Sequence, residues 1–173
     1  MTVLEEIELR RMIRRLAMQA VECAGGTENL ALVGIRTRGV VLAKRLQQEI
    51  FAAEGVDVPL GILDIALYRD DLLTGGCDAV FKGSEISFPL EGKTVILCDD
   101  VLYTGRTVRA ALAALAGVGR ADRVKLFCLI DRGHRELPFR AEGVGKSVPS
   151  GKNEKIVVHF RETDGEDCVL LLK

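Results

Sequence analysis

The sequence has 173 residues, 48% of them hydrophobic and 28% charged, which is the composition of one ordinary globular domain. Its 24 basic and 25 acidic residues give a net charge of −1, which excludes a wholly cationic nucleic-acid binder but is compatible with a local basic face. No apolar run approaches the ~20 residues of a membrane-spanning helix, and the N-terminus has no hydrophobic signal core. We therefore expect a single cytoplasmic domain over residues 1–173, with no membrane partner.

Cysteine and histidine usage limits the metal and redox chemistry that the sequence predicts. The five cysteines, at positions 23, 77, 98, 128 and 168, form no CxxC motif of the kind that binds zinc or performs thiol exchange. Cys98 and Cys128 lie in apolar runs, where a thiol behaves as a small buried hydrophobic group. Because His134 and His159 are the only histidines, a histidine-rich metal site is excluded.

The first half of the chain alternates helical and strand patterns. Residues 4–23 carry an apolar stripe at helical spacing, and a Gly-Gly pair at 25–26 ends this helix. The continuous apolar run at 30–35 predicts a strand buried on both faces. A loop at 36–39 leads to a predicted helix over 40–54. A second strand is expected at 59–68.

The second half continues the same alternation. Residues 69–88 lack clear periodicity and predict a long loop, of the kind that often carries function. Strands are expected at 94–98 and 124–130, with an alanine-rich helix at 107–116 between them. Two further strands, at 156–160 and 168–172, flank Asp164 and Gly165 and predict a C-terminal β-hairpin. This order predicts an α/β fold, with a mostly parallel central sheet flanked by helices.

The segment VILCDDVLYTGRTVRAAL, residues 95–112, is the richest in chemistry. A buried strand ends in Asp99 and Asp100, and Gly105 then permits a tight turn or a close approach to a ligand. The helix that follows offers unpaired N–H groups and the positive end of a dipole, which suit a phosphate. Because the two carboxylates would repel that phosphate, we expect them to face hydroxyl groups or a cation. A sugar phosphate with neighbouring hydroxyl groups satisfies both demands.

This segment has alternative interpretations besides a sugar-phosphate site. Neither the Walker pattern GxxxxGK[ST] nor GxGxxG is present. An aspartate pair after a strand also occurs in phosphoacceptor and magnesium-binding folds, but that interpretation gives the following Thr-Gly-Arg-Thr no role. A solvated acidic turn with a threonine helix cap is the purely structural alternative.

The segment VILCDDVLYTGRT resembles the 5-phosphoribosyl-1-pyrophosphate (PRPP) signature of the type I phosphoribosyltransferases. The extended wording VLYTGRTVRAAL resembles the PyrR family, uracil phosphoribosyltransferases that often also regulate the pyrimidine operon. The likeness covers almost the whole chain and includes the segments 32–46, 63–72, 82–86, 131–146 and 154–160. It implies the type I phosphoribosyltransferase fold, with a small hood formed by parts of the N-terminal and C-terminal segments.

The resemblance assigns roles to the matching residues. It implies that Asp99 and Asp100 hold the ribose hydroxyls, that the loop after them binds the 5-phosphate, and that Arg38, with the two aspartates, is catalytic. Its nucleotide-binding residues in the first half of the chain are Arg36, Thr37, Arg38, Gly39 and Arg69. Those in the second half are Asp99, Asp100, Val101, Leu102, Tyr103, Thr104, Gly105, Arg106, Thr107, Arg132 and Ile156.

Three further expectations concern the mechanism. Residues from Arg69-Asp70-Asp71 onward are expected to form a flexible loop that closes over the sugar and excludes water. Magnesium is expected to bind through PRPP rather than in a protein cage, and to neutralise the leaving pyrophosphate. We expect His134 to be a structural or RNA-facing residue rather than a general base.

The regulatory half of the resemblance predicts RNA binding. The partners it implies are PRPP, uracil, UMP, the leader mRNA of a pyrimidine operon and further copies of this chain in a homo-oligomer. The expected basic face carries Arg14, Arg15, Arg135, Arg140 and Lys146. Met18 and Cys23 depart from it, since regulatory relatives often have His and Arg there. Two alternatives stay open: a nucleotide-sensing RNA-binding regulator with little catalysis, and a phosphoribosyltransferase for another base.

Overall fold

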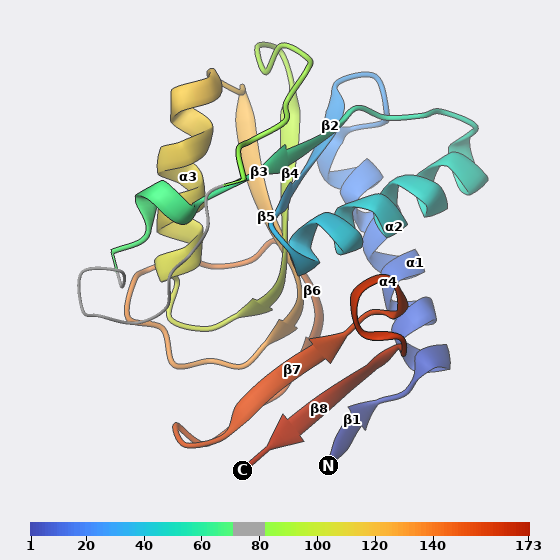
Figure 1. Ribbon diagram of the computed structural model, residues 1–173. Coiled ribbons are helices and arrows are strands. Elements are labelled where there is room, and N and C mark those ends of the chain that lie inside the picture. Colours follow the sequence, from blue (N-terminus) through green and yellow to red (C-terminus); the bar gives the residue numbers. More distant parts are fainter. Residues whose placement is uncertain (71–81) are drawn as a thin grey trace.

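The computed structural model describes residues 1–70 and 82–173. A five-stranded parallel sheet of strand order β3-β2-β4-β5-β6 forms its centre, and a three-stranded antiparallel sheet of order β1-β8-β7 lies below the carboxyl ends of the central strands (Figure 1). We call the smaller sheet the hood. The central strands are β2 (Leu30–Ile35), β3 (Leu60–Leu63), β4 (Thr94–Leu102), β5 (Arg123–Asp131) and β6 (Gly143–Ser147). The hood strands are β1 (Thr2–Leu4), β7 (Lys155–His159) and β8 (Cys168–Leu172).

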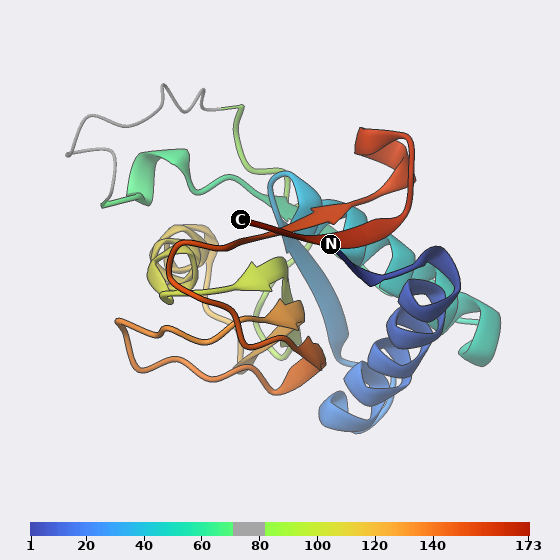
Figure 2. The same cartoon turned by 90° about the horizontal axis from the view of Figure 1, so that it is seen from below.

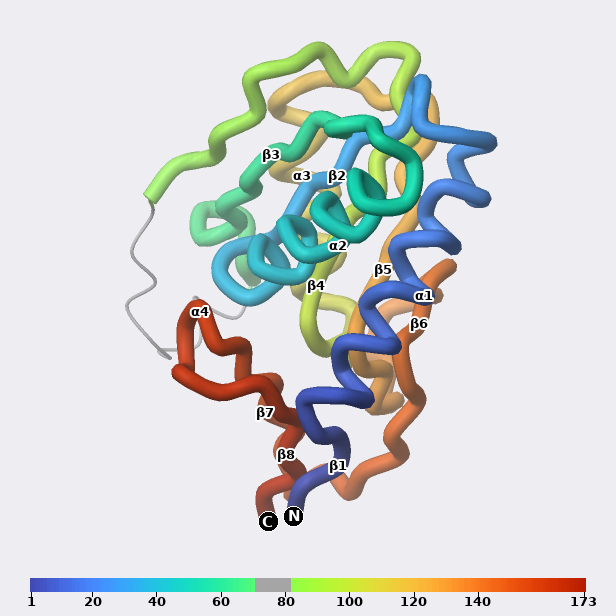
Figure 3. The backbone as a smooth tube through the Cα atoms, turned by 90° about the vertical axis from the view of Figure 1, so that its right-hand side faces the viewer, coloured from blue at the N-terminus to red at the C-terminus, as the bar shows by residue number. Residues whose placement is uncertain are grey.

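Helices cover both faces of the central sheet. Helices α1 (Glu6–Ala24) and α2 (Arg38–Glu54) pack on one face, and α3 (Arg106–Val118) packs on the other (Figures 1 and 3). The predicted apolar stripe of α1 is confirmed, since its buried residues run from Leu9 to Ala20. Among the described residues, no helix combines the length and the apolar character needed to cross a membrane.

The hood shares a hydrophobic core with α1 and α2. Ile156, Val158 and Phe160, on or just after β7, and Val169 on β8 are all buried in the cluster that also holds Leu9, Leu16 and Leu46. Viewed from below, the hood crosses the ends of the central strands (Figure 2). The hood is therefore packed onto the main body rather than attached by a free linker.

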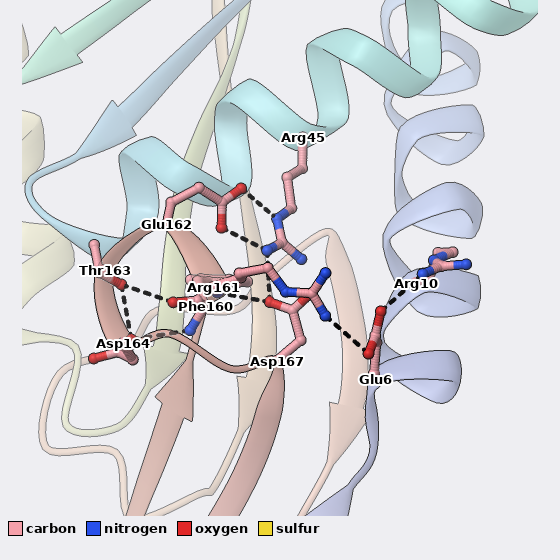
Figure 4. Close-up of polar contacts among 9 residues, drawn as sticks. All are labelled: Glu6, Arg10, Arg45, Phe160, Arg161, Glu162, Thr163, Asp164 and Asp167. Atoms are coloured by element: carbon pink, nitrogen blue, oxygen red, sulfur yellow. Dashed lines mark hydrogen bonds and ion pairs between the residues drawn. The ribbon is translucent and has the colours of Figure 1, made fainter.

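A network of ion pairs fixes the connection between β7 and β8, which contains the short helix α4 (Arg161–Asp164). Arg45 of α2 donates hydrogen bonds to Glu162 at 2.9 and 2.6 Å and to Asp167 at 2.6 Å (Figure 4). Arg161 pairs with Glu6 of α1 at 3.0 Å (Figure 4). Two helices thus hold one loop of the hood.

The structure corrects several predicted boundaries. The strand predicted over 59–68 ends at Leu63, because the side chain of Asp64 accepts the N–H of Ala66 and turns the chain into a 3₁₀-helix, Ala66–Tyr68. Strand β4 continues to Leu102, so the two aspartates lie within it rather than after it. The described part of the predicted 69–88 loop includes an isolated bridge between Ile62 and Glu85.

Two strands, β1 and β6, were absent from the prediction. Strand β6 is short and contains two glycines, which hide it from a search for apolar alternation. Both glycines are required by packing: an added Cβ would lie 2.4 Å from the ring of Phe127 at position 143, and 2.3 Å from the carbonyl oxygen of Leu129 at position 145.

The loop at 36–39 lies directly against the end of β4. A Cβ added to Gly39 would lie 2.3 Å from the carbonyl oxygen of Cys98, which is backbone and cannot move aside as a side chain could. The absence of a side chain at position 39 therefore lets this loop reach the edge of the sheet next to Asp99.

We expect Gly39→Ala to destabilise the fold by about 1–3 kcal/mol, because the added methyl group overpacks a backbone contact. Urea denaturation followed by circular dichroism measures the change. Gly119→Ala is the matched control, since its Cβ would make only ordinary contacts at 3.6–3.7 Å with Glu91 and Leu90. Equal stability of the two variants would contradict the packing argument.

Candidate functional site

A cleft of about 370 Å³ opens at the carboxyl end of β4 and the start of α3. Ligands of parallel α/β sheets bind in this position, beyond the carboxyl ends of the strands. The cleft brings together nine of the predicted site residues, from the strand, the loop and the segment before residue 71. They are Arg69, Asp99, Val101, Leu102, Tyr103, Thr104, Gly105, Arg106 and Thr107.

Asp99 and Asp100 form an acidic pair at the mouth of β4. Asp99 is buried, and Asp100 beside it is half-buried. Burial raises the pKa of the Asp99 carboxyl well above its ordinary value, and the neighbouring charge of Asp100 raises it further. The carboxyl accepts the backbone N–H of Asp100 at 3.0 Å. An acidic pair held in this way favours a cation or donating hydroxyl groups in the cleft.

The loop after β4 presents the N-terminus of α3 to the cleft. Gly105 has a φ of 94°, which favours glycine, and an added Cβ would make tight contacts of 3.0 Å with Phe139 and 3.3 Å with Leu137. The carbonyl of Thr104 accepts the backbone N–H groups of Glu136 and Leu137 at 2.9 and 3.0 Å. These contacts fix the loop that leads into the N-terminus of α3, and the positive end of a helix dipole suits an anion.

The side chain of Arg106 is held by two carboxylates. Its guanidinium pairs with Asp70 at 2.8 Å and with Glu136 at 2.9 Å, and these acids raise its pKa. Arg106 thus connects residue 70 to the loop between β4 and α3. Asp71 and the rest of the predicted flexible loop as far as residue 81 lie outside the described residues.

The two arginines of the loop at 36–39 bind different parts of the structure. Arg36 donates to the carbonyl of Gly83 at 3.1 and 2.9 Å, so its side chain holds the 82–85 segment. Arg38 donates to Asp164 at 2.6 Å, and its buried Nε has no hydrogen-bond partner among the described residues. The peptide bond between Arg36 and Thr37 is cis. Arg38 is therefore the arginine of this loop with an unsatisfied donor.

Asp64 and Asp164 are site residues that sequence reasoning missed. The buried carboxylate of Asp64 accepts N–H groups from Lys82 and Gly83 at 2.6 and 3.0 Å, and these bonds lower its pKa. Asp164 accepts the N–H of Phe160 at 2.9 Å and holds Arg38; despite its burial, these contacts lower its pKa to about 2. Neither residue has a local motif, because each acts on a segment distant in the sequence.

Arg132 is buried and stacks on Tyr103, with its guanidinium carbon 4.1 Å from the ring centre. It donates to Ser150 at 3.0 Å and to the carbonyls of Gly151 and Glu154 at 2.9 and 2.8 Å. Tyr103 lines the cleft, whereas Arg132 lines a second hollow of about 420 Å³ at the ends of β5 and β6. The stacked pair forms the wall between the two spaces.

Ile156 and His134 occupy different surroundings. Ile156 is 6% exposed within the core shared by the hood and α1, and it does not line the cleft. His134 has a φ of 62° and lines the second hollow, with its ring edge-on to Tyr103 at 6.0 Å. Its Nε2 lies against the carbonyl of Ser150, which fits a positioned histidine.

The five predicted RNA-binding residues fall into two groups. Arg15 donates to the carbonyls of Val144 and Gly145, and Arg135 donates to those of Tyr103 and Phe139 and to the Asp131 carboxylate. The guanidinium groups of both arginines therefore make hydrogen bonds within the protein. The other three, Arg14, Arg140 and Lys146, are exposed, and only Arg14 has an ion pair among the described residues, to Glu49 at 3.3 Å.

Comparison with known proteins bears on this arrangement. Residues 3–162 match the phosphoribosyl transferase domain family. A Deinococcus radiodurans protein named Bifunctional protein PyrR is 50% identical over 170 residues, which cover 98% of this chain and 93% of that protein. The protein of the same name from Thermus aquaticus is 54% identical over 164 residues, covering 95% and 91%. This chain belongs to the PyrR family of phosphoribosyltransferases.

Solved structures of more distant proteins have the same fold. A hypoxanthine phosphoribosyltransferase from Staphylococcus aureus superposes with a TM-score of 0.74 at 20% identity, covering 100% of this chain and 92% of that one. A Trypanosoma cruzi hypoxanthine phosphoribosyltransferase gives 0.76 at 20% identity, covering 99% and 94%. The predicted type I phosphoribosyltransferase fold is confirmed, and the cleft of this PyrR-family chain lies at the ligand-binding edge of that fold.

Asp99 and Asp164 have opposite pKa shifts, which predicts opposite effects of neutralising them. A raised carboxyl pKa costs stability once pH exceeds the unfolded value near 4, whereas a lowered one adds stability that is lost as pH falls towards 2. We expect Asp99→Asn to raise the melting temperature at pH 7 and Asp164→Asn to lower it. Thermal unfolding of both variants from pH 3 to 8 measures this.

Both differences from the unsubstituted protein should shrink towards the acid end of the range. Asp57→Asn is the control, because Asp57 is exposed and has no ion pair among the described residues. A lower melting temperature for Asp99→Asn at pH 7 would contradict the electrostatic account of the acidic pair.

Proposed function

We propose that this protein transfers the phosphoribosyl group of PRPP to uracil, forming UMP and pyrophosphate. The observation that carries the proposal is the cleft itself, which brings Asp99 of the acidic pair together with Arg106 and Thr107 at the N-terminus of α3. A sugar phosphate needs both features, one for its hydroxyls and one for its phosphate. Half or more of the sequence is identical to that of PyrR proteins over nearly its whole length, which supports uracil as the base.

The proposed chemistry needs no covalent intermediate with the protein. The bond between C1 of the ribose and the pyrophosphate oxygen breaks with its electron pair on oxygen, and a ring nitrogen of uracil supplies the pair for the new bond to C1. The uracil N–H proton leaves to solvent or to the departing pyrophosphate. Because C1 becomes electron-poor on the way, the protein contributes mainly by positioning and by charge stabilisation.

Each element of the cleft has a proposed part in this reaction. Thr104, Gly105 and Thr107 hold the 5-phosphate, and the Asp99–Asp100 pair holds the ribose hydroxyls. Arg38, in the loop that packs against the end of β4, is the proposed partner of the pyrophosphate. The oxygen-rich acidic pair also fits a magnesium ion carried in on PRPP, which would supply charge neutralisation for the leaving group.

The second hollow is the proposed place for the base. It adjoins the cleft across the Tyr103–Arg132 stack, and its lining includes backbone from the end of β5, residues 131–133. Backbone donors and acceptors there would recognise uracil by shape and hydrogen bonding. Arg132, whose donors hold the 150–154 loop, would then act by shaping the wall of this hollow rather than by donating to the base.

An assay of pure protein with PRPP, magnesium and a panel of bases tests the proposal. Uracil is expected to give UMP and pyrophosphate, while orotate, hypoxanthine, guanine and xanthine give none. We expect Asp100→Asn and Arg38→Ala each to lower turnover by about 10²–10³, the typical effect of losing one preorganised charge contact. Chromatography of the nucleotides with a pyrophosphate assay measures both.

Control variants separate chemistry from folding in this assay. Asp57→Asn and Arg11→Ala remove exposed groups elsewhere and should leave turnover unchanged. Product from a purine base instead of uracil would make the protein a phosphoribosyltransferase for another base. No product from any base, with UMP still bound, would favour the nucleotide-sensing regulator with little catalysis.

Binding of leader mRNA is the second proposed activity. The exposed basic residues proposed for this contact are Arg14 on α1, Arg140 before β6 and Lys146 on β6. UMP in the cleft would be the signal that strengthens binding. A homo-oligomer, which the resemblance implies, stays a prediction.

We expect Arg140→Ala with Lys146→Ala to weaken leader-RNA binding and to lower its salt slope by about 2, because two phosphate contacts are lost. Filter binding across a salt series measures both quantities. The paired control, Lys44→Ala with Lys152→Ala, removes two exposed lysines elsewhere and should change neither. An unchanged slope in the first variant would place the RNA surface elsewhere.

A further inference from the structure

Three side chains with metal-binding atoms meet on the hood, outside the cleft. His159 on β7 and Cys168 on β8 are directly opposite each other in the antiparallel register, and Glu166 precedes Cys168 in the loop. The His159 Nδ1, a Glu166 carboxylate oxygen and the Cys168 Sγ all lie within 4.8 Å of one another. The His159 Nδ1 lies 2.9 Å from the Glu166 Oε1 and 3.8 Å from the Cys168 Sγ.

We infer that His159, Glu166 and Cys168 form a binding site for a Zn²⁺ ion that clips the β7–β8 hairpin. Imidazole nitrogen, thiolate sulfur and carboxylate oxygen are the ligands that zinc takes in proteins, and bond lengths of about 2.0–2.3 Å set tetrahedral ligands about 3.3–3.6 Å apart. The observed separations bracket that range. A water molecule would complete the fourth position.

The charges around the cluster favour a cation. Asp164 and Asp167, on either side of Glu166, are already paired with Arg38 and Arg45. Within the part of the chain that the structure describes, Glu166 has no arginine or lysine partner and pairs with His159 alone.

Access and protonation are both compatible with binding. The side chains of His159 and Glu166 are 25% and 62% exposed, and Cys168 is half-buried, so the ion reaches the cluster from solvent. On binding, the Cys168 thiol loses its proton to solvent. His159 binds through Nδ1 as neutral imidazole with its proton on Nε2, which makes no hydrogen bond to the described residues.

The site acts on a loop that is already organised. Residues 160–167 connect the two ligand-bearing strands. Arg45 holds this loop through Glu162 and Asp167 (Figure 4), and Arg38 holds it through Asp164. The cluster lies at the open end of the loop, where β7 and β8 diverge. Zinc would therefore lock the hairpin where the arginines do not reach.

Cobalt binding tests the inference with the full chain, reduced and free of chelator. Co²⁺ is expected to give the near-ultraviolet charge-transfer absorption of a thiolate ligand, and an equivalent of Zn²⁺ is expected to remove it. The acidic pair of the cleft offers oxygen ligands alone, so cobalt bound there gives no such absorption. Zinc at about 100-fold above its dissociation constant should raise the melting temperature by about 5–10 °C.

Variants assign the absorption to this cluster. Cys168→Ser should abolish it, and His159→Gln and Glu166→Gln should each weaken cobalt binding at least 10-fold. Cys23→Ser is the matched control, since Cys23 is a half-buried thiol like Cys168 but lies on α1, and it should leave the absorption intact. No thiolate absorption in the unsubstituted protein, or its survival in Cys168→Ser, would overturn the inference.

Discussion

The site depends on the close backbone contact between Gly39 and the carbonyl of Cys98. This contact brings the 36–39 loop against the end of β4, where a side chain of any size would hold the two apart. Arg38, at the start of α2, and Asp99, near the end of β4, are far apart in the sequence. Because Gly39 has no side chain, the two residues can lie at the same edge of the central sheet.

The carboxyl groups near that edge have pKa values shifted in opposite directions. Burial and the neighbouring Asp100 disfavour the charged form of Asp99. Asp164 and Asp64, in contrast, are stabilised as carboxylates by the N–H groups and arginines that face them. Strain of this kind is typical of functional sites, where a group is held for a ligand rather than for the fold. The fold offsets it through the two large apolar clusters on either side of the sheet.

Continuous apolar runs predicted the central strands well, because parallel strands buried on both faces leave that pattern. The sequence also predicted the order of strand, glycine turn and helix around the acidic pair, since these are local features, but it ended the strand before Asp99, whereas β4 continues to Leu102. It missed β6, whose glycines are required by Phe127 and Leu129 on the neighbouring strand.

The tasks of individual arginines could not be predicted either. Arg36, Arg132 and Arg135 all donate to backbone carbonyls of loops far away in the sequence. A carbonyl is present at every position, so such a bond leaves no signature in residue types. The register of β7 and β8 likewise brought His159 and Cys168 together across eight intervening residues, a pairing that no spacing rule reveals.

The network around α4 also determines how this fold can be recombined. Arg38 and Arg45 belong to α2, whereas the carboxylates they hold belong to the loop between β7 and β8, more than 100 residues later. Figure 4 shows the contacts of Arg45. A chimera that takes its C-terminal hairpin from another enzyme separates the carboxylates from their arginines. The unit of exchange among relatives is therefore the hairpin together with the first turns of α2, and these positions should covary.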